Sequence, residues 1–315
     1  MINYALRRVP SALLVLIVAS VLVFAVPRLA SGDAADILAG PDSTAATREA
    51  VRHDLGLDQS PFLQYVQWAR GLLTGDLGTS YIRKEPASHA ITAALGQTVT
   101  LTVAALILAV VLGGLAGVVL GTGRRRLVTR PVGALVSLAF ALPPYVSGVL
   151  LVLLFAVTIR LLPATGYMPL SQSPDIAVQY LLMPALCLAL PTAATLARFL
   201  AASVRQVNDE DYIRTGVAKG LTSSRLVRAH VVPNALPPVL TVLGIQIGQL
   251  LGGAIVVEAI FAWHGIGDLL VNSVLDRDYV LVQDILLFAV AVFVVVQTLT
   301  DLVHAAIDPR IRLEA

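Results

Sequence analysis

The sequence predicts an all-α integral membrane protein with about six transmembrane helices. Of its 315 residues, 57% are hydrophobic and only 13% are charged, and the mean hydropathy is +0.82. This composition lies far from that of soluble domains. A helix needs about 20 mostly apolar residues to cross the hydrocarbon core of a bilayer. Six stretches reach that length, at about 9–29, 98–121, 132–159, 178–203, 235–261 and 280–306.

The placement of charge predicts how these helices are oriented. Net charge is only +2, but four arginines crowd the short loop between 121 and 132, and a further basic segment covers 198–228. Because Lys and Arg concentrate in short cytoplasmic loops, both termini are expected in the cytoplasm. The apolar run from Val9 to Val26 is longer than the core of a cleaved signal peptide, so we expect a retained first span rather than the alternative signal. The arginines that count are Arg7, Arg8, Arg124, Arg125, Arg126, Arg130, Arg310 and Arg312.

The predicted spans divide the chain into two parts. Residues 1–97 hold the first transmembrane helix and a long extracellular loop, and residues 98–315 hold a five-helix core with a cytoplasmic loop at about 205–233. Within the long loop, apolar residues recur at helical spacing around Tyr65 and Trp68. This pattern predicts a short amphipathic helix that either rests at the membrane interface or packs on its own loop.

Two spans carry glycine at every fourth position. Such a stripe leaves one helix face without side chains, so that another backbone can approach closely. We expect these helices to pack on each other or on a partner, although glycine is also common in transmembrane helices that have no such contact. The second span carries Gly113, Gly117 and Gly121, and the fifth carries Gly244, Gly248 and Gly252.

Prolines interrupt two spans. "LPPY" at 142–145 lies inside the third span, and Pro184 and Pro191 lie inside the fourth. A proline inside a helix removes a backbone hydrogen bond and can kink it. Such kinks either shape a cavity or serve as static packing features.

Carboxylates in the spans are the candidate functional acids. Charged side chains inside lipid are costly, and Glu258 and Asp284 lie near the outer ends of the fifth and sixth spans. Ion coupling is one interpretation, and an interfacial or structural role is the other, which their off-centre positions favour. The five histidines and the single cysteine, Cys187, show no metal-ligand spacing, so no metal site is predicted.

The segment "DYIRTGVAKGLTSSRLVRAHVVPNALPP", at 211–238, is the longest polar interruption of the core. It predicts a helix that Gly220 ends and a second helix that Thr222, Ser223 or Ser224 caps and that runs to Pro233. Two short helices joined by a glycine turn are suited to insertion into a groove on another protein. A solvated basic loop is the alternative.

At this segment the sequence resembles the permease subunits of ATP-binding-cassette (ABC) importers of the dipeptide/oligopeptide family. Those subunits typically read "DYIRTARAKGL", and this chain reads "DYIRTGVAKGL". Gly220 and Pro233 keep the spacing of the family's importer loop, whereas Gly216 and Val217 depart from it and are expected to loosen the first helix. The blocks "LGLDQSPFLQYVQWARGLLTGDLGTS" and "NALPPVLTVLGIQIGQLLGGAIVVEAIFAWHGIGDLL" are also similar, with His264 where the family usually has proline.

The resemblance implies a type I ABC importer permease fold and a multi-pass protein of the bacterial inner membrane. It implies half of a translocation pathway for di- or oligopeptides or similar small solutes, with haem and nickel chelates also carried in the family. The implied partners are a second homologous permease, two ATPase subunits or domains, an extracellular substrate-binding protein and membrane lipid, but no nucleic acid. The implied ATPase interface is Arg214, Thr215, Gly216, Ala218, Lys219, Gly220 and Leu221.

The chain is not expected to be an enzyme. It lacks the Walker A pattern G-x-x-x-x-G-K-[ST], so the resemblance places ATP and Mg²⁺ on partner subunits and no cofactor on this chain. The alternative is a self-sufficient, ion-coupled secondary transporter or channel that uses Glu258 or Asp284. That model predicts internal repeats, and the two halves of the sequence show no convincing one.

Overall fold

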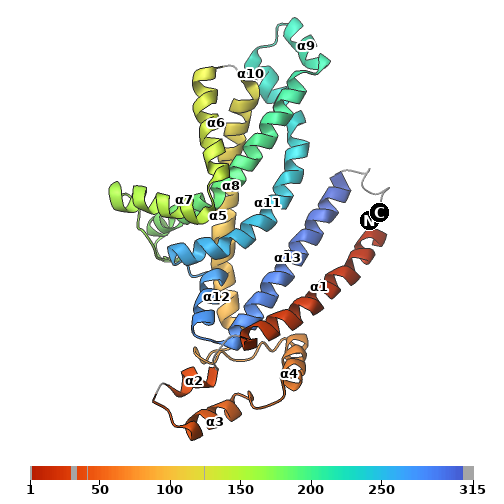
Figure 1. Cartoon of the computed structure of the whole chain (residues 1–315). Helices are drawn as coiled ribbons and strands as arrows, with labels where there is room; N and C mark the ends of the chain where they lie inside the picture. Colours follow the sequence, from red (N-terminus) through yellow and green to blue (C-terminus); the bar gives the residue numbers. More distant parts are fainter. Residues whose placement is uncertain (1, 30–33, 41, 124, 308–315) are drawn as a thin grey trace. The chain divides into compact units, whose positions relative to one another are not determined.

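The computed structural model describes residues 2–29, 34–40, 42–123 and 125–307 (Figure 1). The described chain is almost entirely helical, as predicted. Backbone contacts divide it into two compact units, residues 1–97 with 264–315 (unit 1) and residues 98–263 (unit 2). The predicted division placed all of 98–315 in one core, whereas by these contacts residues 264–315 group with residues 1–97.

Unit 2 is built around one long helix, α8 (Pro174–Asn208), which packs along α11 (Val232–Phe261). Its core consists of small and aliphatic side chains such as Cys187, Leu188 and Leu250, closed at one end by Phe261 and Trp263. The rest of the unit comprises the main part of α5 (Ala87–Thr122), α6 (Arg126–Ala141), α7 (Pro144–Leu151), the π-helix η1 (Val152–Thr158), α9 (Asp211–Ala218), α10 (Ser223–Leu226) and the π-helix η2 (Val227–Val231).

The third predicted span is not one straight helix. It consists of α6 and the α7–η1 pair, which are bent by 117° at a short break. The break falls at Leu142, which has extended backbone angles, because the residue before a proline is pushed out of the helical region. Pro144 then starts α7 at a position where its missing N–H is not needed. In contrast, α8 continues without a break through Pro184 and Pro191.

Within the described residues, four helices are long and apolar enough to cross a membrane, or five if the bent pair counts as one span. The four are Ala87–Thr122, Pro174–Asn208, the continuous stretch Ser223–Phe261, and Tyr279–Thr298. A shorter apolar stretch, Pro10–Val26, lies in the predicted first span. The predicted membrane class is confirmed, and the third of the six predicted spans is corrected to a broken one.

Unit 1 pairs the first and last helices of the chain. α1 (Ile2–Leu29) and α13 (Tyr279–Ile307) run side by side (Figure 1). Ile91, from the first turns of α5, packs with Ile266, Leu281 and Ile285 in a second apolar cluster. The unit also holds α2 (Ala34–Ala39), α3 (Ala45–Asp54), α4 (Pro61–Thr74) and α12 (Ile266–Leu275). The side chains of Arg7, Arg8, Arg310 and Arg312 lie outside the described part, so the orientation of the termini stays a prediction.

The predicted amphipathic helix of the long loop is α4. Ser60 caps its start, and Gly75 ends it at φ 79°. One face packs against α1, where the rings of Tyr65 and Trp68 lie 5.3 and 5.8 Å from that of Phe24. Beside this face, Phe62 is 77% exposed and Leu73 is 90% exposed. The helix therefore packs on a transmembrane helix and still presents apolar side chains to its surroundings.

Candidate functional site: the α9–α10 elbow

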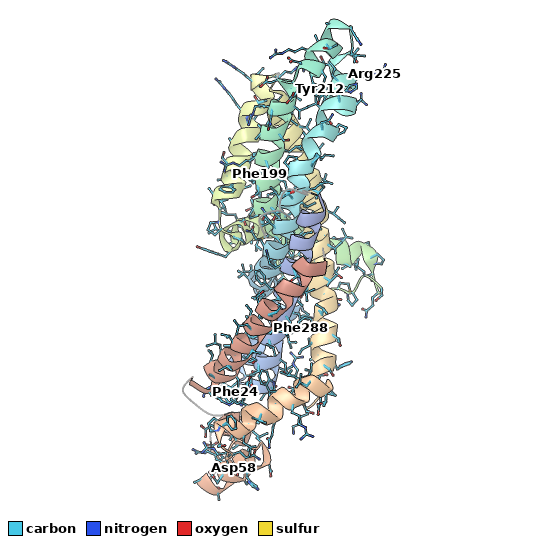
Figure 2. All side chains as sticks on the ribbon, turned by 90° about the vertical axis from the view of Figure 1, so that its right-hand side faces the viewer. Phe24, Asp58, Phe199, Tyr212, Arg225 and Phe288 are labelled. Atoms are coloured by element: carbon cyan, nitrogen blue, oxygen red, sulfur yellow. The ribbon has the colours of Figure 1, made fainter. Side chains whose placement is uncertain are left out.

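The elbow, which we define as Asp211–Val231, covers α9, α10 and η2. It lies at one end of unit 2, beyond the last turn of α8, and Tyr212 and Arg225 lie at this end in Figure 2. Ile213 and Val231 of the elbow belong to the core cluster of unit 2, so the elbow is anchored to the end of the helical core.

Gly220 ends α9 in the left-handed conformation, at φ 77°. The amide of Gly220 donates to the carbonyl of Val217 at 2.9 Å, and the amide of Leu221 donates to that of Gly216 at 3.1 Å. These two hydrogen bonds satisfy carbonyl groups that would otherwise lack a partner at the end of the helix. A Cβ at Gly220 would meet no atom within 4 Å, so glycine is needed here for its backbone angle and not for space.

Gly216 is the point where α9 touches α10. Ile213, Gly216 and Leu226 are the buried residues of the two helices. A Cβ on Gly216 would lie 2.7 Å from Cδ2 of Leu226, so the missing side chain lets the two helices approach. The sequence predicted that Gly216 would loosen α9, whereas the structure shows it in the contact that joins α9 to α10. No sequence signal identified Leu226 as its partner.

The outer face of α9 combines apolar and basic side chains. Tyr212 is 46% exposed and Val217 60% exposed. Arg214 and Lys219 are also exposed, and the ion pair of Arg214 with Asp211 spans 3.4 Å at the surface. Exposed pairs of this kind contribute little stability, so Arg214 remains free to engage another partner. Thr215, Ala218 and Gly220 are exposed as well, whereas Leu221 is half-buried.

A continuous helix joins the elbow to the membrane core. The stretch Ser223–Phe261 is 39 residues long, so the predicted end of the second helix at Pro233 is wrong. The reason is the π-helical turn η2, which ends two residues before this proline. In a π-helix each amide bonds to the carbonyl five residues earlier instead of four, and this change of pairing occurs next to the proline, which has no N–H to donate. Nδ2 of Asn234 donates to the carbonyl of His230 at 2.6 Å. Thr222 precedes α10, but no side-chain capping bond forms there.

The two glycine stripes have different surroundings. A Cβ on Gly113 would lie 2.7 Å from the carbonyl oxygen of Ala193, and one on Gly121 would lie 2.6 Å from Cβ of Val204. Gly117 likewise faces Leu200 of α8, at 2.8 Å. In α11, a Cβ on Gly252 would meet no atom within 4 Å, and Gly244 and Gly248 are half-buried. The close contact of α11 with α8 is made instead by Gly253, whose Cβ would lie 3.1 Å from Cδ1 of Leu188.

The two candidate acids lie in different units. Glu258 is fully buried near the end of α11, where its carbonyl accepts from the amide of Trp263 at 2.9 Å. Asp284 is buried in α13, and its Oδ1 accepts from Nε1 of Trp68 at 2.8 Å. Within the described residues, no group of three or more His, Cys, Asp or Glu side chains could hold a metal ion.

These features define a class of protein: a multi-pass membrane protein whose core helices are continuous with a small helical elbow outside the core. The fold is shared with solved importers. The inward-facing MetNI methionine ABC transporter aligns with a TM-score of 0.57 at 19% identity, over 70% of this chain and 96% of that chain. An amino acid ABC transporter determined with histidines aligns with a TM-score of 0.51 at 18% identity, over 68% of this chain and 92% of that one.

The chain belongs to the family of binding-protein-dependent transport system inner membrane components. The family's main model matches residues 109–313, and the model of its N-terminal part matches residues 1–102. The glutathione transport system permease protein GsiC of Escherichia coli O6:H1 is 37% identical over 313 residues, 99% of both chains. The probable peptide ABC transporter permease protein y4tP of Sinorhizobium fredii is 34% identical over 309 residues, 98% of this chain and 99% of that protein. The chain is therefore a multi-pass inner-membrane permease subunit of an ABC importer.

Proposed function

We propose that this permease forms one half of a heterodimeric pathway and that its elbow docks on a cytoplasmic ATPase subunit. The observation that carries the proposal is the continuity of the helix from Ser223 to Phe261. At 1.5 Å per residue it is about 58 Å long and begins with α10, on which α9 packs through Gly216 and Leu226. A displacement of α9 would therefore be passed through α10 to a membrane-spanning helix.

The chemistry of the elbow supports docking on a protein groove. Tyr212 and Val217 offer apolar contact area, and Arg214 and Lys219 offer charge, all on one short helix. A partly apolar helix that inserts into a groove is a common mode of protein recognition. Because the sequence has no Walker A pattern, the proposed source of energy is ATP hydrolysis, with Mg²⁺, on two partner ATPase subunits or domains. A second, related permease completes the pathway.

The proposed solutes are di- or oligopeptides and peptide-like molecules of the size of glutathione, delivered by an extracellular binding protein. The support comes from two relatives, one named for glutathione transport and one for peptide transport. Uptake of labelled glutathione and of labelled dialanine, in cells that lack this chain and in complemented cells, tests the assignment. Restored uptake of either supports it, and uptake of neither by complemented cells contradicts it.

Docking is tested by purification of the tagged chain from its native membrane. The variant Tyr212→Ala with Arg214→Glu should lose the copurifying ATPase, whereas Arg70→Glu, an exposed arginine on α4, should retain it. Both variants should reach the membrane at the wild-type level. Retention of the ATPase by the double variant would overturn the docking proposal.

A further inference from the structure

α8 contacts α5, α6, α7 and α11 on different faces. One face meets α5 through Ala193, Leu200 and Val204. A second meets α11, where Leu188 contacts Gly253 and Oγ of Ser203 donates to the carbonyl of Ala235 at 2.9 Å. At 3.6 residues per turn, Leu190, Ala194, Arg198 and Arg205 fall within a sector of about 80° that faces away from α11.

An apolar groove follows the first part of this third face. It has a volume of about 360 Å³ and lies between α5, α6 and α8. All eleven lining residues are Leu, Val or Ala, among them Leu112, Ala116, Leu135, Ala139, Leu190 and Ala194. The groove is open to one side, since Leu135 is exposed. A cavity without polar groups does not hold ordered water, and at the depth of the transmembrane helices the available filler is hydrocarbon.

Arginines follow the groove along the same face. Arg198 is exposed, and its guanidinium lies 4.6 Å from the ring centroid of Phe140, beside the groove residue Ala139. Two turns further along α8, Arg205 lines a polar pocket of about 390 Å³ together with Gly121, Thr122, Asn208, Asp209 and Val227. Arg126 and Arg130, at the start of α6, are also exposed.

An exposed arginine in a transmembrane helix needs an anion. Within the described residues, the interaction found for Arg198 is the aromatic stacking on Phe140, and none of the ion pairs includes it. Arginine binds phosphate through two parallel hydrogen bonds. Basic pockets between transmembrane helices are known sites for anionic lipid head groups.

We propose that an anionic phospholipid binds this face, with one acyl chain in the α5–α6–α8 groove and its phosphate at Arg198 and Arg205. The acyl chain of the lipid covers the aliphatic side chains that line the open groove. Its phosphate neutralises the two arginines beyond the end of the groove. The site does not involve ATP, although Val227 of the elbow also lines the pocket of Arg205. A segment of a second permease is the competing occupant, and it is distinguished below.

The test uses the complex reconstituted in nanodiscs that contain phosphatidylglycerol or phosphatidylcholine with a photoreactive diazirine in the acyl chain. Phosphatidylglycerol should label peptides of α6 and α8 at least fivefold more than phosphatidylcholine. Ala139→Leu fills the groove and should reduce the labelling severalfold, whereas Ala134→Leu, the same change at an exposed site on α6 outside the groove, should not.

The head-group contact is tested separately. Arg198→Gln should reduce the preference for phosphatidylglycerol about fivefold, which corresponds to the ~1 kcal/mol that one basic residue contributes near anionic lipid. Arg160→Gln, at an exposed loop arginine, should leave the preference unchanged. Equal labelling by both lipids, equal labelling of the two alanine variants, or cross-links from this face to the second permease in place of lipid would overturn the proposal. Since the readout needs no transport, its failure is distinct from failure of the docking proposal.

Discussion

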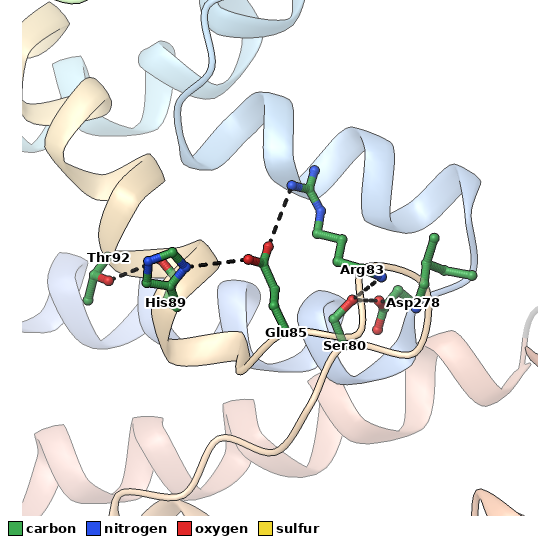
Figure 3. A network of polar contacts seen from close by, with 7 residues as sticks. Ser80, Arg83, Glu85, His89, Thr92 and Asp278 are labelled. Carbon is green, nitrogen blue, oxygen red and sulfur yellow. Dashed lines mark hydrogen bonds and ion pairs between the residues drawn. The ribbon is translucent and has the colours of Figure 1, made fainter.

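In unit 2, α5 meets α8 with glycines set directly against backbone and Cβ atoms, whereas in unit 1 a loop is fixed to the start of α13 by a buried carboxylate (Figure 3). Asp278 accepts from the hydroxyl of Ser80 and from the amides of Ile82 and Leu281, the last two both at 3.3 Å. The α5–α8 contact requires that the glycines carry no side chain. The loop contact requires the carboxylate oxygens of Asp278. Different substitutions should therefore damage the two units.

In unit 2, a large effect is expected from adding one methyl group to the α5–α8 contact. Gly113→Ala would place its Cβ 2.7 Å from a backbone oxygen of α8, and overpacking of this kind costs about 1–3 kcal/mol. The measurement is the thermal stability of the purified chain in detergent. Gly114→Ala is the matched control, because a Cβ at the adjacent position meets nothing within 4 Å. Equal stability of the two variants would contradict the packing described for unit 2.

In unit 1, the comparable change removes polar atoms. Asp278→Ala leaves the buried hydroxyl of Ser80 and the two amides without their acceptor, and each unsatisfied buried group costs about 1–3 kcal/mol. The loop should then open, with faster trypsin cleavage at Arg83 and Lys84. Asp276→Ala removes an exposed carboxylate from the same turn and should leave the cleavage rate unchanged. Faster cleavage in both variants would show that Asp278 has no special role.

The contact of α4 with α13 allows one hydrogen bond of unit 1, from Trp68 to Asp284, to be tested by itself. Trp68→Phe keeps an aromatic ring beside Phe24 but removes the donor to Asp284, whose Oδ2 has no hydrogen-bond partner among the described residues. We expect a loss of stability of about 1 kcal/mol, the usual net contribution of a hydrogen bond. In a double-mutant cycle with Asp284→Ala, which removes the acceptor, additive losses in the thermal unfolding of the full chain would show that the two side chains are not coupled.

The smallest expected effect is on the pH dependence of the segment that follows α3 in unit 1. Nδ1 of His53 lies 2.7 Å from Oδ2 of Asp58, and this contact raises the pKa of His53 above 6.5 and lowers the pKa of Asp58 below 3.8. The stabilisation linked to His53 is complete below pH 6.5 and is lost as pH rises through its raised pKa. The part linked to Asp58 is present above pH 3.8 and is lost as pH falls through its lowered pKa.

Amide hydrogen exchange of residues 51–60, corrected for the intrinsic rate, measures this dependence. Protection should be greatest between the two shifted pKa values and should fall above the raised pKa of His53. Both side chains are exposed, so the change should be small. His53→Gln should remove the pH dependence above pH 6, and an unchanged profile in that variant would exclude the pair as its cause.

The sequence predicted the class of fold and the approximate positions of most spans because hydrophobic length is a local property. It also located the turn at Gly220 and the interruption at Leu142–Tyr145, which glycine and proline set through their own backbone restrictions. It did not predict the continuity of the helix through Pro233, because a π-helical turn has no local signature.

Neighbours distant in the sequence could not be predicted. Both glycine stripes have the same spacing, yet a Cβ on Gly113 would meet α8, while a Cβ on Gly252 would meet no atom of the described residues within 4 Å. The partner of Asp284 is Trp68, 216 residues away, and the partner of Gly216 is a leucine on the next helix. Such contacts depend on how helices dock, which periodicity alone does not specify.

The central claim, that the elbow and α11 move as one lever, is tested by breaking the helix between them. Two glycines inserted between Val231 and Val232 leave α9 and its exposed face intact. In the reconstituted complex, the account predicts that the ATPase still copurifies but that its hydrolysis no longer drives solute uptake. The same insertion between Ser171 and Gln172, in an exposed loop, should leave uptake coupled. Uptake coupled to hydrolysis in the first variant as in wild type would contradict the lever.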